Sequence, residues 1–242
     1  MVMPELLQRR DLVLTNNSGP YDVPIAEHVM ALAFAASKRL HEYARQQAGR
    51  EWKDRRHAEL RDATMVVLGI GSIGRETARL AKAVGMRVIG VRRRLDAEPV
   101  PEAERVVGMD RLAEVAAEAD YLAVCAPLTA LTTGLVSAEV IARMKPTAWI
   151  INIARGAIVD QAALLAALKS ERIGGAALDA WWEEPLPADS EWWMLPNVIV
   201  TPHSSNSSPK LRQRSLELIV ENARRFRAGE PLLNVVDTVA GY

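Results

Sequence analysis

A glycine-rich turn between an apolar run and a segment of helical period narrows the folds open to this chain. The run Met65–Leu68 leads directly into Gly69-Ile70-Gly71-Ser72-Ile73-Gly74, and a helix is predicted from Gly74 to Val84. In this setting the first glycine permits a tight turn, the second lets the backbone approach a pyrophosphate, and the third lets helix and strand pack closely. The spacing predicts a dinucleotide cradle, with a merely tight turn as the alternative. The residues expected at the dinucleotide are Gly69, Gly71, Ser72, Ile73 and Gly74.

Short runs rich in Val and Ile alternate along the chain with longer segments of helical period. This alternation is typical of a parallel sheet covered by helices. The predicted strands cover Met65–Leu68, Arg87–Val91, Tyr121–Cys125, Ala148–Ile153, Gly175–Leu178 and Val198–Thr201. The predicted helices cover Gly74–Val84, Arg111–Ala117, Ser137–Arg143 and Gln161–Lys169, with Gly85 ending the first and Asp160 capping the last. The fold class is therefore α/β, a doubly wound parallel sheet of the Rossmann type with helices on both faces.

Two further helices are expected outside this core. One runs from Val23 to about Gln47 and carries an apolar face that needs a partner surface. The other runs from Ser208-Pro209 to about Phe226, because Ser caps a helix well and Pro is tolerated at its first position. The apolar face of the first helix, together with the tryptophans around Trp192, predicts a homodimer.

Charge and cysteine content exclude several classes of protein. The 242 residues hold 30 Lys and Arg against 30 Asp and Glu, and a net charge of zero argues against nucleic acid or a membrane surface as partner. The single Cys125 has no disulfide partner, and no Cys/His spacing indicates a metal site. No apolar run approaches the roughly 18 residues of a membrane span, and the first residues lack a signal-peptide pattern. We expect a cytoplasmic protein without a bound metal.

Three consecutive arginines follow the second predicted strand. Arg92-Arg93-Arg94 lies near the position, about 20 residues beyond the glycine turn, where an acidic residue would bind the ribose 2′-OH of NAD. Guanidinium groups there would pair with a 2′-phosphate instead. The triplet predicts NADP as the preferred cofactor, with NAD as the other choice. A solvated run of charge is the alternative interpretation.

Four blocks in the rest of the chain resemble the D-isomer-specific 2-hydroxyacid dehydrogenases. Thr15–His28 resembles the entry into the helix that links the two domains of that family, and Ala126–Thr132 resembles the loop beside the cofactor. Asn152–Asp160 matches the pattern N-x-x-R-G-x-x-V-D, and the last block runs from Leu178 to His203. The resemblance places Asp179 at the nicotinamide carboxamide. The cofactor contacts it implies are Ala126, Pro127, Thr132, Ile153, Ala154, Asp179 and His203.

Three polar residues suit the reduction of a 2-oxo acid. Arg155 follows a predicted strand, and its planar fork suits a carboxylate or carbonyl group. His203 follows the last strand, and an imidazole can donate and recover a proton near neutral pH. Glu184 could fix the tautomer of that imidazole, although Glu183 offers the same chemistry. The resemblance assigns the same roles to Arg155, His203 and Glu184. The remaining histidines are expected on the surface or in packing contacts: His28, His41 and His57.

The domain that would close over the substrate looks incomplete. The family builds this flavodoxin-like substrate domain mostly from its N-terminal part, and here the resemblance begins midway through that part. The expected division is residues 1–23 as a remnant of the substrate domain, 24–207 as the dinucleotide-binding domain with its linking helix, and 208–242 as a C-terminal helix returning to the substrate domain. Such a chain is expected to turn over 2-oxo acids poorly, because the cleft lacks a wall.

The function predicted by these features is hydride transfer between NAD(P)H and a small 2-oxo or 2-hydroxy acid, of the glyoxylate or hydroxypyruvate reductase kind. Two alternatives stay open. A dinucleotide-sensing interaction protein would need little turnover, and the retained Arg155, Glu184 and His203 count against it. A formate-type dehydrogenase is disfavoured, because Thr201 precedes Pro202-His203 where that branch usually has Gln.

Overall fold

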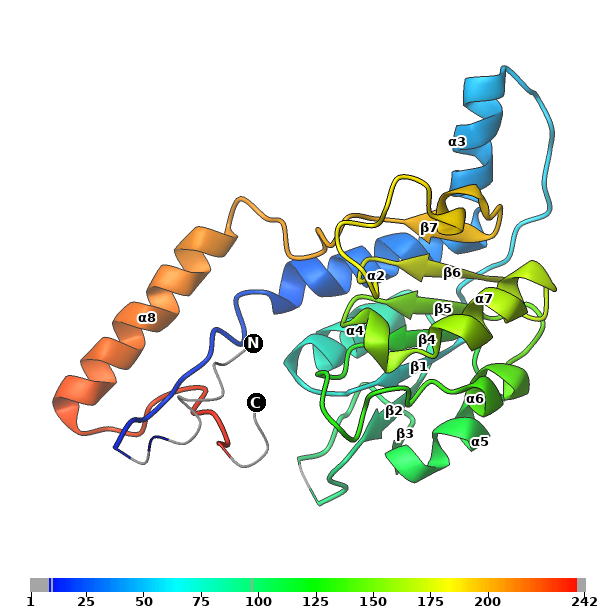
Figure 1. Ribbon diagram of the computed structural model, residues 1–242. Coiled ribbons are helices and arrows are strands. Elements are labelled where there is room, and N and C mark those ends of the chain that lie inside the picture. The colour runs from blue at the N-terminus through cyan, green and yellow to red at the C-terminus, as the bar shows by residue number, and fades with distance from the viewer. Residues whose placement is uncertain (1–8, 10, 97, 239–242) are drawn as a thin grey trace.

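One parallel sheet organises the chain in the computed structural model, which describes residue 9, residues 11–96 and residues 98–238. Within these residues the sheet has seven strands in the order β3-β2-β1-β4-β5-β6-β7. The strands are β1 (Thr64–Leu68), β2 (Arg87–Arg92), β3 (Arg105–Gly108), β4 (Tyr121–Val124), β5 (Trp149–Asn152), β6 (Gly175–Leu178) and β7 (Val198–Val200). The predicted doubly wound sheet is therefore confirmed (Figure 1).

Helices cover both faces of the sheet (Figure 1). The α-helices are α2 (Asp22–Ser37), α3 (Leu40–Gly49), α4 (Ser72–Ala83), α5 (Leu112–Ala116), α6 (Ala138–Arg143), α7 (Gln161–Lys169) and α8 (Leu211–Ala228). Short 3-10 helices lie at Met109–Arg111, Gly156–Ile158 and Glu191–Met194. None of the helices formed by the described residues combines the length and the apolar character that crossing a bilayer requires.

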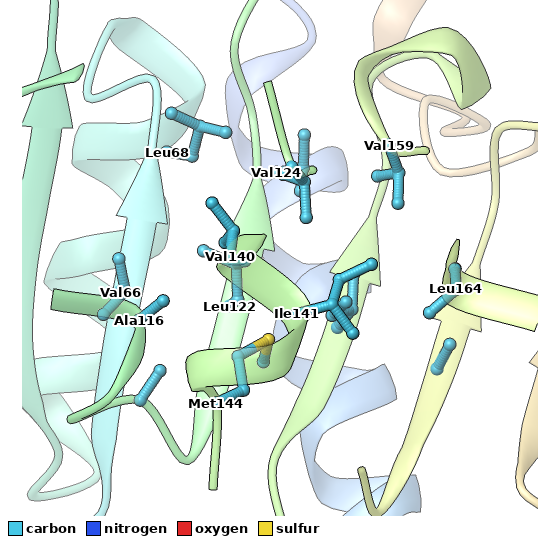
Figure 2. Close-up of a cluster of buried hydrophobic side chains, with 14 of the residues drawn as sticks. Val66, Leu68, Ala116, Leu122, Val124, Val140, Ile141, Met144, Val159 and Leu164 are labelled. Carbon is cyan, nitrogen blue, oxygen red and sulfur yellow. The ribbon is translucent and has the colours of Figure 1, made fainter. Parts of the chain in front are cut away.

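Alternate residues of β1 enter two different cores. Val66 and Leu68 pack with residues of α5, α6 and α7, and Figure 2 shows this cluster around Leu122 and Val140. Met65 belongs to the opposite cluster, which α2 and α4 complete. All five residues of β1 are buried, because a strand in the middle of a parallel sheet has a covered face on each side. This is why the inner strands are uniformly apolar in the sequence.

The predicted strands are all present, and β3 is the one that the sequence analysis missed. It has four residues, lies at the edge of the sheet, and begins with the half-exposed Arg105. A half-exposed edge strand lacks the continuous apolar run that identified the buried strands. The predicted roles of Gly85 and Asp160 are confirmed. Gly85 ends its helix with φ +86°, and the Asp160 side chain accepts the Ala163 N–H.

The predicted helix from Val23 to Gln47 is wrong as a single element. It divides into α2 and α3 at Lys38 and Arg39, and Arg39 takes the left-handed conformation with φ 52°. Neither Gly nor Pro marks the break. The Lys38 ammonium donates to the Ala58 carbonyl, and the Arg39 guanidinium donates to the Arg56 carbonyl. Contacts with a distant segment, which local sequence does not encode, therefore accompany the bend.

The apolar face of the first helix is used inside the chain, so it cannot be the reason for a homodimer. Val29 and Ala33 are fully buried in the cluster that α2 shares with α4 and the sheet. Trp192 is also buried, and its ring stacks on that of Trp182 with the ring centroids 5.4 Å apart. Tertiary packing covers the apolar face of α2 and the Trp192 side chain, whereas the neighbouring Trp193 stays 46% exposed.

The last helix, α8, lies apart from the sheet (Figure 1). None of its residues is buried, and its exposed apolar side chains are Leu216, Ile219, Val220 and Phe226. It begins at Leu211 rather than at the predicted Ser208-Pro209, because residues 208–210 form a turn in which the Ser208 hydroxyl accepts the Lys210 N–H. Parts of the predicted terminal segments, residues 1–8, 10 and 239–242, lie outside the described residues.

Candidate active site

A groove of about 650 Å³ opens at the carboxyl ends of β1, β2 and β4. The strand order reverses at this point, because β2 and β3 lie on one side of β1 and β4 lies on the other. Loops that leave β1 and β4 therefore diverge, and ligands of doubly wound sheets bind in the crevice between them. Of the predicted cofactor residues, those lining the groove are Gly69, Gly71, Ser72, Arg92, Arg93, Arg94, Ala126, Pro127 and Thr132.

The three glycines of the turn meet different surroundings. Gly69 has φ +92°, and a Cβ there would overlap the backbone nitrogen of Ala126. A Cβ on Gly74 would overlap the carbonyl oxygen of Gly69, so this residue has to be small for α4 to approach β1. Nothing lies within 4 Å of a Cβ on Gly71. Gly69 and Gly74 are thus needed by the fold, whereas the space beside Gly71 is open to a ligand.

Two substitutions in this turn are expected to separate folding from dinucleotide binding. Gly74→Ala should cost about 1–3 kcal/mol through the clash, more than the roughly 1 kcal/mol that alanine gains over glycine in a helix. Gly71→Ala should leave the melting temperature unchanged and weaken NADPH binding about tenfold, because the methyl group occupies the approach to the pyrophosphate. Thermal melts and fluorescence titrations measure both. Unchanged NADPH affinity in Gly71→Ala would place the pyrophosphate elsewhere.

The arginine triplet lies at the end of β2, where the sequence placed it beside the ribose. The Arg92 guanidinium donates to the carbonyls of Glu98 and Leu95, at 2.8 and 3.3 Å, and so braces the loop after β2. Arg93 and Arg94 are exposed and line the groove. Arg93 and Arg94 face solvent as well as the groove, so a solvated charge run and a phosphate contact are compatible for this pair.

The loop after β4 forms the opposite wall of the groove and is shaped by Thr132. This side chain is 5% exposed, and its hydroxyl donates to the Pro127 carbonyl at 2.6 Å and accepts the Thr129 N–H at 2.8 Å. Both bonds close the loop on itself. Thr132 thus holds Ala126 and Pro127 against the glycine turn, in addition to lining the groove.

The residues that line the groove without having been predicted as cofactor contacts include Arg75, Val235 and Asp237. Arg75 lies in the first turn of α4 and donates to the carbonyls of Pro99 and Glu98. Val235 and Asp237 come from the segment after α8, which returns to pair with the N-terminal segment through an antiparallel bridge between Thr15 and Val235. No local signal places a C-terminal segment at a groove built near residue 70, because only the tertiary structure brings the two together.

Arg155 stands on a turn that Asn152 organises at the end of β5. The buried Asn152 amide donates to the Arg155 carbonyl at 2.9 Å, and its oxygen accepts the Ala154 N–H at 3.0 Å. A Cβ on Gly156 would overlap the backbone of Trp181, so the turn packs closely against the next loop. The Arg155 side chain is exposed, and one of its N–H groups donates to the Ala154 carbonyl.

The His203 ring contacts the Glu184 carboxylate at hydrogen-bond distance, as predicted, and Glu183 does not take this place. His203 Nδ1 lies 2.9 Å and 2.8 Å from the two carboxylate oxygens of Glu184. Burial opposes ionisation of Glu184, but the Trp181 N–H, the His203 ring and the charge of Arg155 outweigh it, and the pKa of Glu184 falls below its usual range. A carboxylate only accepts, so Nδ1 carries the proton and Nε2 is directed away from the pair. Arg155 is near enough to act on the same carboxylate.

Asp179 is fully buried and binds the loop that carries His203. Its oxygens accept from the Thr201 hydroxyl at 2.6 Å and from the N–H groups of Ser204 and Ser205 at 2.9 Å. Burial disfavours the charged form, but these donors outweigh it, so the pKa of Asp179 lies below its usual range. His203 has φ 52°, a conformation that costs a non-glycine residue roughly 1–3 kcal/mol. The bonds to Asp179 hold this turn in place.

The predicted site residues thus fall into two groups, those that line the groove and those that lie elsewhere at the carboxyl edge of the sheet. The predicted cofactor residues that do not line the groove are Ile73, Gly74, Ile153, Ala154, Asp179 and His203. Ile73 and His203 are half-buried, and the other four are buried. Arg155, Asp179 and His203 follow β5, β6 and β7, so they share the carboxyl edge of the sheet with the glycine turn. Among residues 9, 11–96 and 98–238, no three His, Cys, Asp or Glu side chains gather as a metal site would require.

Comparison of the sequence with models of known families identifies the family of this chain. The sequence model of a family described as "D-isomer specific 2-hydroxyacid dehydrogenase, NAD binding domain" matches residues 30–205, which contain the glycine turn, Arg155, Glu184 and His203. The chain belongs to this family of dehydrogenases. Members of the family are NAD(P)-dependent oxidoreductases, and the resemblance found in the sequence is confirmed.

Relatives of this 2-hydroxyacid dehydrogenase align over most of its length. A glyoxylate reductase of Korarchaeum cryptofilum is 35% identical over 95% of this chain and 70% of its own length. The solved NADPH-dependent glyoxylate/hydroxypyruvate reductase of Sinorhizobium meliloti, in complex with NADP and sulfate, is 29% identical, with a TM-score of 0.86 over 99% of this chain and 77% of that one. A D-isomer specific 2-hydroxyacid dehydrogenase of Xanthobacter autotrophicus with NADPH and MES is 32% identical, with a TM-score of 0.86 over 99% of both chains.

Proposed function

We propose that this dehydrogenase reduces small 2-oxo acids of the glyoxylate or hydroxypyruvate kind with NADPH. The observation that carries the proposal is the His203–Glu184 pair, with Arg155 near enough to act on the same carboxylate, at the sheet edge that continues from the dinucleotide groove. Relatives named glyoxylate reductase and glyoxylate/hydroxypyruvate reductase support the substrate class.

The groove fits a dinucleotide, because the space beside Gly71 is open and exposed guanidinium groups line the end where a 2′-phosphate would lie. The bound NADPH supplies the hydride. Arg155 binds the carboxylate and polarises the oxo group of the substrate, since its planar fork matches both oxygens. His203 donates the Nε2 proton to the oxo oxygen as it becomes a hydroxyl. Glu184 accepts the Nδ1 proton, and its charge stabilises the doubly protonated ring, in which Nε2 also carries the proton that is transferred.

Oxidation of NADPH by glyoxylate and by hydroxypyruvate in the presence of the 242-residue protein, followed at 340 nm, tests this function. Turnover with either acid supports the proposal, whereas dinucleotide binding without turnover on any small 2-oxo acid would favour the dinucleotide-sensing interaction protein. The retained Arg155, Glu184 and His203 argue against that alternative. Reduction of NAD+ or NADP+ by formate, followed at the same wavelength, would instead support the formate-type dehydrogenase, which the relatives do not favour.

We propose further that NADP is preferred over NAD. Arg93 and Arg94 line the groove at the end of β2, in the place where an acidic residue directly after the strand would bind the 2′-OH of NAD. Solved relatives in complex with NADP or NADPH support this preference. Arg92 is a poorer target for its test, because its bonds to the Leu95 and Glu98 carbonyls also brace the loop.

Replacing the two exposed arginines should change the choice of cofactor. Arg93→Ala combined with Arg94→Ala is expected to weaken NADPH binding by about tenfold or more, because charge-assisted bonds to a phosphate are lost, and to leave NADH binding nearly unchanged. Fluorescence titration of both reduced cofactors measures the ratio. Arg143→Ala, which removes an exposed α6 residue paired with Glu139, is the matched control. Equal losses for NADPH and NADH would contradict the assignment.

We also propose a homodimer, now on a different surface from the one expected from the sequence. None of the residues of α3 is buried, and the helix projects from the sheet (Figure 1). Trp52 is completely exposed beside a cavity of about 690 Å³ that Tyr43 and Arg50 help to line. Arg45 fixes the base of the helix by donating to the carbonyls of Pro196 and Leu195. A helix held out from the domain with an exposed tryptophan suits a second copy of the chain.

Sedimentation equilibrium at micromolar concentration is expected to show a dimer of the 26.6 kDa chain. Trp52→Asp should raise its dissociation constant by about 30-fold or more, because buried aromatic anchors contribute at least 2 kcal/mol to interfaces. Phe226→Asp changes an equally apolar, exposed residue on α8 and is the control. A stable monomer before substitution would exclude the dimer, and a larger effect of Phe226→Asp would move the interface to α8.

We propose that residues 24–207 form the dinucleotide-binding domain, with residues 1–23 and 208–242 belonging to the substrate domain. Residues 24–207 contain the whole sheet and all of the lining residues of the groove except Val235 and Asp237, whereas α8 adds no buried residue to either core. Cytoplasmic location is proposed because NADPH is a cytoplasmic reductant and the single Cys125 is a free thiol.

A further inference from the structure

His28 was expected to be a surface or packing residue, yet it lies beside the carboxylate of Asp179, which binds the turn that carries His203. It belongs to α2, and its Nε2 atom is 3.3 Å from Thr201 Oγ1 and 3.7 Å from Asp179 Oδ1. Asp179 has no exposed surface, and the His28 side chain is 23% exposed. Residues that are 173 positions apart in the sequence thus meet at the carboxyl ends of β6 and β7.

The number of protons on the Thr201 hydroxyl fixes which group donates in the His28–Thr201 and Thr201–Asp179 hydrogen bonds. The Thr201 hydroxyl has one proton, and at 2.6 Å that proton lies between Thr201 and the ionised Asp179. Only the lone pairs of Thr201 Oγ1 remain for His28, so His28 Nε2 is the donor. The bonds therefore run in one sense, from the His28 N–H to the Thr201 oxygen and from the Thr201 O–H to Asp179.

The other bonds of Asp179 reach the residues next to His203. Its carboxylate accepts the N–H groups of Ser204 and Ser205, directly after the left-handed residue. The position of the carboxylate consequently sets the position of the turn. A shift of the turn would move the imidazole relative to Glu184, because the His203 side chain has no hydrogen-bond partner in the described residues other than that carboxylate.

We propose that His28 and Thr201 are positioning residues for the His203 imidazole and act on it through the Asp179 carboxylate. The proposal rests on the proposed function of His203 as the proton donor. A contribution to catalysis is expected because proton transfer requires a donor aligned within hydrogen-bonding reach of the substrate oxygen. The chain of bonds also means that the linking helix α2 contributes to the site without touching the substrate.

Thr201 allows a clean test, because its backbone is held independently of its hydroxyl. The Thr201 N–H donates to the Leu178 carbonyl, and the Thr201 carbonyl accepts the indole N–H of Trp181. Thr201→Val retains both bonds and the shape of the side chain. It should lower kcat with glyoxylate about tenfold, through the loss of one bond to a buried charge, while NADPH affinity changes less than about twofold. Thr201→Ser restores the hydroxyl and should recover most of kcat.

The same comparison applies to His28. His28→Leu should lower kcat by about threefold to tenfold, and His28→Gln, whose amide can donate to Thr201 Oγ1, should recover most of it. Ser170→Ala removes a hydroxyl-to-carbonyl bond at the end of α7, far from the site, and is the control expected to leave kcat unchanged. Melting temperatures that fall in Thr201→Val and His28→Leu with kcat unchanged would overturn the proposal, since the bonds would then serve stability alone.

A measurement that needs no turnover separates this proposal from the proposed function. The His203 ring proton shared with Glu184 should give a downfield imidazole N–H resonance in the 15N-labelled protein, assigned by its loss in His203→Gln. It should weaken or shift in Thr201→Val and His28→Leu and return in Thr201→Ser and His28→Gln. If the unsubstituted chain reduces no 2-oxo acid but the resonance responds in this way, the substrate assignment fails and the positioning role stands. An unchanged resonance in Thr201→Val and His28→Leu overturns the positioning role.

Discussion

His203→Gln is expected to reduce glyoxylate turnover by about a thousandfold, because a positioned general acid contributes between about a hundredfold and ten-thousandfold to such reactions. Glutamine approximates the reach of the ring but cannot exchange a proton at neutral pH. NADPH affinity should change less than about twofold, since His203 is not among the residues that line the dinucleotide groove. Stopped-flow turnover and fluorescence titration on the same preparation measure the two quantities.

Glu184→Gln provides the companion measurement. It keeps an acceptor near His203 Nδ1 but removes the charge that favours the protonated ring, so an intermediate loss of kcat is expected. Near-normal turnover in His203→Gln would show that another group donates the proton. Glu183→Gln is the matched control. It makes the same chemical change at the adjacent residue, whereas the His203 ring contacts Glu184.

Arg155→Lys is expected to lower kcat/KM for glyoxylate by about a hundredfold while retaining the positive charge. The loss follows from geometry, because an ammonium group cannot form the two parallel bonds that a guanidinium makes to a carboxylate. The turn that presents the residue should persist, since Asn152 holds it through the backbone carbonyl of residue 155 and the N–H of Ala154. Circular dichroism and melting curves check that point.

The effect of Arg155→Lys should appear mainly with the substrate and not with the cofactor. NADPH affinity is expected to change less than about twofold, because Arg155 does not line the dinucleotide groove. Arg143→Lys on α6 is the control for the same chemical change at an exposed position. Equal kcat/KM values for Arg155→Lys and the unsubstituted protein would remove Arg155 from the substrate site.

The sequence by itself determined every strand of the sheet except the edge strand β3, and the order of the site residues along the sheet edge. Continuous apolar runs such as Met65–Leu68 identify strands with two covered faces, and the spacing of the glycine turn after β1 fixes the place of the dinucleotide groove. Arg155 and His203 follow strands, so parallel topology alone brings them to one edge. These features depend on neighbours in the chain, which is why local pattern was sufficient to predict them.

Only the tertiary structure decided which of the remaining residues take part. The break between α2 and α3 occurs beside contacts to residues 56–58, the face of α2 is buried by α4 and the sheet, and residues after α8 line the groove. His28 looked like a residue of a helix surface until the fold placed it 3.3 Å from the Thr201 hydroxyl. Each of these outcomes depends on contacts between segments far apart in the chain, whose relative placement is set by packing and not by any local preference.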